Sequence, residues 1–171
     1  MRRRSFSAFR LKEAWDKFLA ELNDKWQHFI LKGEFPERRR ILEGLTVEQA
    51  TTRPAEGMHT IYDELWHADG WAQIVINRDE ELDKKWANGE VFPLEQVKTQ
   101  EEWDSLVEHF LGLLDKMIRF TGNTEELKKE DEPGWLVEDY VVSLIIHNTY
   151  HLGKIVAMRQ ILGAWPPPEQ K

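Results

Sequence analysis

The chain has 171 residues, no cysteine and six histidines, and its formal net charge at pH 7 is −8. This length is typical of a single domain, and the acidic balance excludes a general nucleic-acid-binding surface. A sequence without cysteine has no disulfides, cysteine nucleophiles or cysteine-ligated metals, so histidine is the nitrogen ligand that remains. No apolar run approaches the roughly 18 residues of a membrane helix, so we expect a cytoplasmic protein with no membrane partner.

The first half of the chain contains two helical patterns. Apolar residues recur at three- and four-residue steps in the first pattern, which is expected to end at Gly33, and a short helical turn follows at 38–42. The second pattern opens at a capping box formed by Thr60 and Asp63 and is expected to continue to about Asn88. The apolar stripe of the first pattern comprises Leu11, Ala14, Trp15, Phe18, Leu22, Trp26, Phe29 and Ile30.

Two further helical patterns make up the second half, and no segment alternates as a half-buried strand does. The third pattern runs from a cap at Thr99 to about Gly122, and the fourth from about Val137 to Leu162. Four amphipathic helices bury their apolar faces by packing together, so the sequence predicts an all-α, four-helix-bundle domain over residues 1–171. We expect extended termini at 1–7 and 166–171. The connections at 44–59, 89–98 and 122–136 are long for a simple up-and-down bundle and suggest a crossover.

A pair of histidines lies in the fourth helical pattern. His147 and His151 are four residues apart, so their side chains lie on one face, one turn above the other. Leu144 and Ile155 share that face, so both imidazoles are expected inside the bundle. A divalent ion would satisfy two buried imidazoles, because this spacing lets both rings converge on one metal. Two separately hydrogen-bonded core histidines are the alternative.

His67 in the second helical pattern is the candidate third ligand. It lies at the margin of an apolar arc, where it is either a surface residue or a ligand whose other nitrogen is held by a carboxylate. Asp63 and Glu64 are the candidate carboxylates, and either could also act as an acid or base. A di-iron site is excluded because it needs two helical Glu-x-x-His units, and the helical patterns contain one, Glu64 to His67. Surface or packing roles are expected for the remaining histidines, His28, His59 and His109.

Several motifs resemble the DinB superfamily. RPAEGMHT at 53–60 and WHADGW at 66–71 are similar to the family's second-helix motif. HNTYHLGKI at 147–155 and LGAWP at 162–166 are similar to its C-terminal motif. With LTVEQA at 45–50, the resemblance covers about residues 40–168. Members usually have Gly-Gln after the last histidine, whereas this chain has Leu152, Gly153 and Lys154.

The resemblance implies an up-down-down-up bundle and a mononuclear divalent metal site, which maps to His67, His147 and His151. The sequence does not distinguish zinc, nickel, iron and manganese. Known activities in the superfamily include S-transfer and isomerisation that use low-molecular-weight thiols such as bacillithiol or mycothiol, and many members are described as metal-dependent hydrolases. Members are often homodimers. We therefore expect a homodimer acting on a small-molecule substrate, with a diffusible thiol as a candidate partner. A non-catalytic metal-binding bundle and an interaction module are the alternatives.

Overall fold

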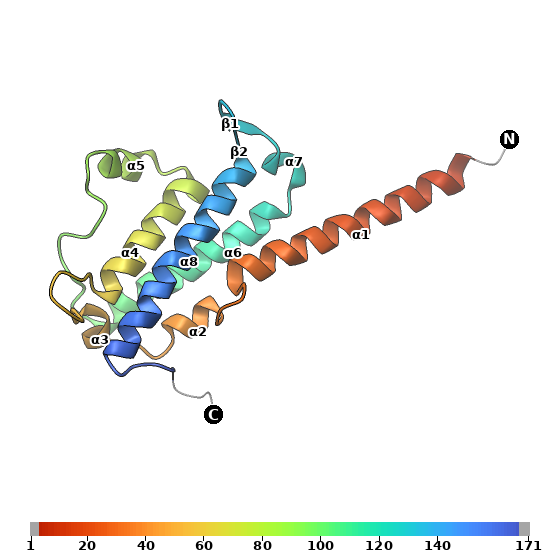
Figure 1. Ribbon diagram of the computed structural model, residues 1–171. Coiled ribbons are helices and arrows are strands. Elements are labelled where there is room, and N and C mark those ends of the chain that lie inside the picture. Colours follow the sequence, from red (N-terminus) through yellow and green to blue (C-terminus); the bar gives the residue numbers. More distant parts are fainter. Residues whose placement is uncertain (1–3, 168–171) are drawn as a thin grey trace.

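Three long helices form the body of the molecule in the computed structural model, which describes residues 4–167 and side chains from residue 12 onward (Figure 1). The central helix, α4 (Ile61–Ala72), packs against both α6 (Gln100–Thr121) and α8 (Val137–Ile161). The all-α prediction is confirmed, and the predicted limits of the third and fourth helices agree with α6 and α8. Side chains that fill the core between these helices include Leu65, Ala68, Trp103, Phe110, Leu114, Leu144, Leu152 and Ile155.

Short helices lie at both ends of this body (Figure 1). The predicted turn at 38–42 is confirmed as α2 (Arg38–Leu42), which contacts α6 and α8. Within the predicted 44–59 connection, α3 (Val47–Thr51) begins at a capping box and contacts α4 and α6. A single-turn helix, α7 (Thr124–Leu127), lies after α6 and contacts α8.

The second predicted helix is correct at its start and wrong in its continuity. The hydroxyl of Thr60 accepts a hydrogen bond from the Asp63 amide at 3.0 Å, as the capping box requires. After Ala72, however, the chain makes a π-helical turn, η1 (Gln73–Asn77), and Arg78 has a left-handed backbone conformation with φ 56°. A separate helix, α5 (Glu80–Ala87), then begins because Asp79 caps it, accepting a hydrogen bond from the Leu82 amide.

A small hairpin corrects the expectation that the chain contains no strand. β1 (Glu130–Glu132) pairs antiparallel with β2 (Trp135–Leu136), and Gly134 turns between them with φ 82°. All three side chains of β1 are acidic and exposed, so the alternation that marks a half-buried strand is absent. The turn glycine, which tolerates a positive φ, is the local signal for this hairpin.

The first helix, α1 (Arg4–Leu31), projects far beyond the body (Figure 1). It contacts α6, and Ile30 near its end is buried. The expected burial of the whole first stripe is wrong, because Trp15 is 57% exposed and Phe18 is 51% exposed. No other element reaches the stretch of α1 that carries them (Figure 1).

The termini also differ in part from expectation. The segment 4–7 belongs to α1 rather than to an extended start, and residues 1–3 lie outside the described part of the chain. After α8 the chain continues without helix to Pro167, which is buried and whose carbonyl accepts a hydrogen bond from Arg40 at 3.0 Å. The expected extended segment at 168–171 lies outside the described residues. Within residues 4–167, no helix has both the length and the apolar character to cross a membrane.

Candidate metal centre

Three histidines from two helices meet beside the core. One ring nitrogen from each of His67, His147 and His151 lies within 4.8 Å of the others. α4 supplies His67, and α8 supplies the other two from consecutive turns. Nε2 of His147 lies 3.2 Å from Nε2 of His67. The structure therefore brings together the three residues that the sequence analysis selected as ligands.

Glu64 orients the ring of His151 through a hydrogen bond to its Nδ1. This carboxylate is completely buried, and its Oε2 lies 2.6 Å from Nδ1 of His151. Lys154 donates a hydrogen bond to Oε1 of the same carboxylate. Burial acts to raise the pKa of Glu64, but the hydrogen bonds and charges of His151 and Lys154 outweigh it and hold that pKa at about 2. Glu64 is therefore an ionised acceptor, so Nδ1 of His151 carries a proton, and in the neutral imidazole the lone pair lies on Nε2.

A backbone carbonyl, rather than the expected carboxylate, orients His67. Nδ1 of His67 donates to the carbonyl of Val91 at 2.8 Å, which leaves the lone pair on Nε2. The ring is stacked on Trp86 with 4.5 Å between centroids and on Phe92 with 4.8 Å. Segments 80–87 and 91–92 thus fix both the tautomer and the orientation of this histidine.

His147 completes the cluster in a strongly desolvated position. Burial, together with the neighbouring His151 and His67, lowers its pKa to about 4. Burial also lowers the pKa of His67 below its ordinary value. Histidines with such pKa values are neutral at pH 7, which is the state that binds a metal ion.

The donor set fits a divalent transition metal. Two nitrogens that share one ion at about 2.0–2.1 Å are roughly 3–3.5 Å apart, and Nε2 of His67 and Nε2 of His147 are 3.2 Å apart. Nδ1 of His147 is buried and has no hydrogen-bond partner among the described residues. A metal-free cluster would also require His147 Nε2 to donate a proton to His67, leaving an unpaired acceptor at that buried Nδ1. With an ion bound, Nε2 of His147 and Nε2 of His67 would both direct lone pairs at the metal, so no proton has to lie between them.

The other candidates of the sequence analysis have different partners. Asp63 belongs to the capping box and accepts a hydrogen bond from Gln96 at 2.6 Å. His59, expected to be a packing residue, lies 3.0 Å from Oε1 of Glu64 and against the Phe92 ring. His109 lies 2.7 Å from the buried Asp69 carboxylate. His28 is on the exposed side of α1.

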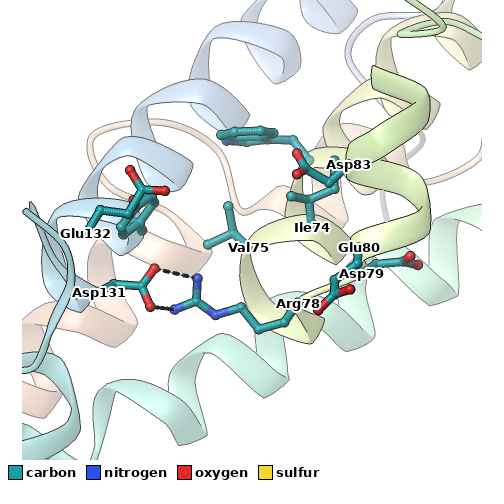
Figure 2. Close-up of a pocket in the computed structure, with 10 residues that line it drawn as sticks. Ile74, Val75, Arg78, Asp79, Glu80, Asp83, Asp131 and Glu132 are labelled. Carbon is teal, nitrogen blue, oxygen red and sulfur yellow. Dashed lines mark hydrogen bonds and ion pairs between the residues drawn. The ribbon is translucent and has the colours of Figure 1, made fainter. Parts of the chain in front are cut away.

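A pocket of about 300 Å³, shown in Figure 2, is connected to the cluster through one side chain, Trp71. Trp71 lines this cavity, and its ring centroid is also 5.9 Å from that of His147. Figure 2 shows the Arg78 guanidinium reaching across to Asp131, with two hydrogen bonds of 2.8 and 2.9 Å. The remaining lining residues are Ile74, Val75, Asp79, Glu80, Asp83, Glu132 and Tyr140. The cavity is large enough for a small molecule, and its apolar residues meet an acidic rim.

Sequence reasoning missed several residues of the centre. The Val91 carbonyl has no side-chain signal, and Trp86 and Phe92 reach His67 only through the tertiary fold. Lys154 was visible as a departure from the usual family motif, and the structure places its ammonium group on Glu64.

Comparison with known proteins adds one match. A family model described as DinB superfamily matches residues 37–155. The matched segment contains all three clustered histidines and Glu64, and it leaves out α1. No curated protein and no solved structure matches the chain.

Proposed function

Because the chain belongs to the DinB superfamily, we propose that it is a metal-dependent enzyme in which His67, His147 and His151 bind one divalent ion. The ion is zinc, nickel, iron or manganese. The reaction is S-transfer that uses a low-molecular-weight thiol, or hydrolysis. The observation that carries this proposal is the orientation of His67 and His151, whose Nδ1 atoms are held by Val91 and Glu64 so that their Nε2 lone pairs are available.

The chain's own residues prepare the site for this chemistry. An ion held by these three imidazoles would supply a Lewis acid that activates a water or a thiol near neutral pH. Glu64 fixes the ring of His151 and increases its basicity, and Lys154 compensates the buried carboxylate charge. Trp86 and Phe92 stack on His67 and exclude water from that side.

The cavity beside Trp71 is the proposed substrate site. Trp71 lines the cavity and its ring also lies beside His147, so a small molecule held there is separated from the ligand cluster by one side chain. Ile74 and Val75 offer apolar surface to its body. Because the chain has no cysteine, any thiol in the reaction enters as a separate molecule.

The corresponding arrangement of helices is an up-down-down-up bundle in which α1 supplies the fourth helix. The packing of its last turns against α6 supports this assignment. We also propose a cytoplasmic location, which the cysteine-free composition supports.

Metal analysis tests the proposal directly. Protein purified without a nickel column is expected to contain or to bind about one divalent ion per chain, and His151→Ala is expected to abolish binding, while His28→Ala retains it. The loaded protein is then screened with low-molecular-weight thiols and a chromogenic electrophile. Wild-type protein that binds no divalent metal would contradict the site. A metal whose spectrum is unchanged by azide and by thiols would contradict catalysis and favour a bracing role.

A further inference from the structure

The histidine cluster and the cavity of Figure 2 lie along the same contact between α4 and α8. Glu64 meets His151 at 2.6 Å, and three residues further along α4, His67 meets His147 at 3.2 Å. The numbers rise along α4 and fall along α8, so the two helices run antiparallel here. Trp71 follows His67 by one helical turn and therefore lies on the same face of α4.

The cavity continues this series of facing residues. Trp71 and Val75 line it from α4 and the turn that follows, and Tyr140 lines it from α8. The Arg78 guanidinium lies 5.8 Å from the centre of the Tyr140 ring, so the two sides also face each other at the far end of the cavity. Trp71 thus stands between the clustered histidines and the space that the cavity offers to a ligand.

Trp71 belongs to a stack of rings that reaches a candidate metal ligand. Its indole is stacked on that of Trp86 with 5.7 Å between centroids and 19° between the planes. Trp86 is in turn stacked on His67 at 4.5 Å, and the centroid of Trp71 lies 5.9 Å from that of His147. A ligand that pushed the Trp71 indole aside would therefore have to break ring contacts on both sides of it.

We propose that Trp71 is the specificity-determining residue of the reaction, because its indole limits the width of the group that can pass from the cavity to the ion. This inference rests on the proposed function, which places the ion at the three histidines and the substrate in the cavity. A substrate then has two parts, a body that the cavity holds and a slender reacting arm that passes the edge of the indole. Among thiols, an unbranched primary thiol reaches the ion, whereas a branched or aromatic thiol does not.

The properties of an indole suit this role. Tryptophan offers a large, rigid surface that turns about only two side-chain bonds, so it resists displacement better than a flexible side chain of similar length. Trp71 is also packed against the core from the body of α4, rather than carried on a loop. The barrier is therefore held by a rigid element, as discrimination by size requires.

Chemical access to His147 tests the barrier without a metal ion. Diethyl pyrocarbonate acylates neutral imidazole, and peptide mass spectrometry of chelator-treated protein measures the rate at each histidine. Trp71→Ala is expected to raise the rate at His147 about tenfold, because the shortened side chain leaves an opening. Trp71→Leu is expected to raise it less, and Trp71→Phe to retain the wild-type rate. The exposed His28 is the internal standard and is expected to react equally in all four proteins.

Two further variants separate a barrier from a general loosening of the fold. Trp15→Ala is the matched control, since it removes a tryptophan that is 57% exposed on α1. Thr60→Ala weakens the cap of α4 and leaves the cavity lining intact. Both are expected to keep the wild-type rate at His147. An unchanged rate in Trp71→Ala and Trp71→Leu overturns the proposal, and so does an equal increase in Thr60→Ala.

A series of thiols of increasing width then tests the size limit at the ion. Cobalt(II) is the probe, because its absorption spectrum changes when a thiolate binds. Ethanethiol is expected to bind to the cobalt-loaded wild type, and 2-methyl-2-propanethiol and benzenethiol only to Trp71→Ala. Trp15→Ala is expected to follow the wild type. Equal affinities of wild type and Trp71→Ala for the two broad thiols overturn the proposal. A wild type that binds no cobalt contradicts the proposed function instead, and the acylation rates still decide whether Trp71 is a barrier.

Discussion

The buried carboxylate of Glu64 and Nδ1 of His151 are 2.6 Å apart, and this contact joins α4 to α8 at the level of the histidine cluster. Because Glu64 also lies against His59 and Lys154, one carboxylate organises three basic side chains. The consequences of this arrangement, and of the packing around it, can be measured.

Glu64→Gln is expected to weaken metal binding about 10–100-fold, because the amide holds the His151 ring with a neutral acceptor in place of a charged one. Competition with a chromogenic chelator measures the affinity. Glu56→Gln, an exposed substitution in the loop before α4, is the control and is expected to bind as the wild type does. Equal affinity of Glu64→Gln and wild type would show that this hydrogen bond does not tune the site.

The metal-free protein is expected to lose stability as the pH falls from about 6.5 to about 4. The pKa of His147 is lowered to about 4 in the folded chain, first by burial and then by His151 and His67. In the unfolded chain the pKa is near 6.5, so the unfolded state binds more protons within this window and acid favours unfolding. Urea midpoints measured in the presence of a chelator give the slope. His147→Gln is expected to reduce it, and His28→Gln to leave it unchanged.

Gly70→Ala is expected to destabilise the fold by about 1–3 kcal/mol, because the new methyl group meets a packed ring. A Cβ at Gly70 would lie 2.9 Å from Cζ2 of Trp86, the ring that stacks on His67. Urea unfolding measures the loss. Gly112→Ala is the matched control in α6, where a Cβ meets nothing within 4 Å, and it is expected to gain about 0.5–1 kcal/mol. Similar effects of the two substitutions would contradict close packing at Gly70.

Thr60→Ala is expected to cost about 1–2 kcal/mol of stability, because α4 loses the side chain that caps it. The buried hydroxyl accepts from the Asp63 backbone amide at 3.0 Å and donates to the side-chain Oε1 of Gln96 at 2.9 Å. Chemical denaturation provides the comparison with Thr52→Ala, an exposed threonine for which a change within about 0.5 kcal/mol is expected. A loss at Thr60 as small as that at Thr52 would mean that the cap contributes little.

Short sequence motifs were sufficient to predict most helix limits. They were insufficient where the backbone conformation depends on residues far away in the sequence. At Thr60 and Thr99 the capping side chain contacts the backbone of the residue three positions later. The local sequence is therefore enough to locate both helix starts. The left-handed backbone conformation of Arg78 has no such local signal, because arginine rarely adopts a positive φ. The apolar stripe of the first helix was recognised correctly, but its periodicity does not say which surface covers it.

In the candidate site, too, some contacts could be predicted from local sequence and others depend on the tertiary fold. The four-residue spacing of His147 and His151 predicted that they share a face. Glu64 was identified as a candidate carboxylate for His67, whereas the structure pairs it with His151. That His67 is held by the Val91 carbonyl could not be predicted, because every residue carries such a carbonyl and only the fold selects one. The positions of Trp86 and Phe92 depend on how the chain returns over α4 after the break at Arg78.

The stack of Trp86 on His67 makes the centre optically visible. Trp86 lies 4.5 Å from His67 and 5.7 Å from Trp71, which in turn lies 5.9 Å from His147. Two indoles are thus in contact with two of the three imidazoles, where a protonated ring or a paramagnetic ion quenches emission from either one. The tryptophan fluorescence of the unlabelled protein is therefore expected to change when these histidines are protonated or bind a paramagnetic ion.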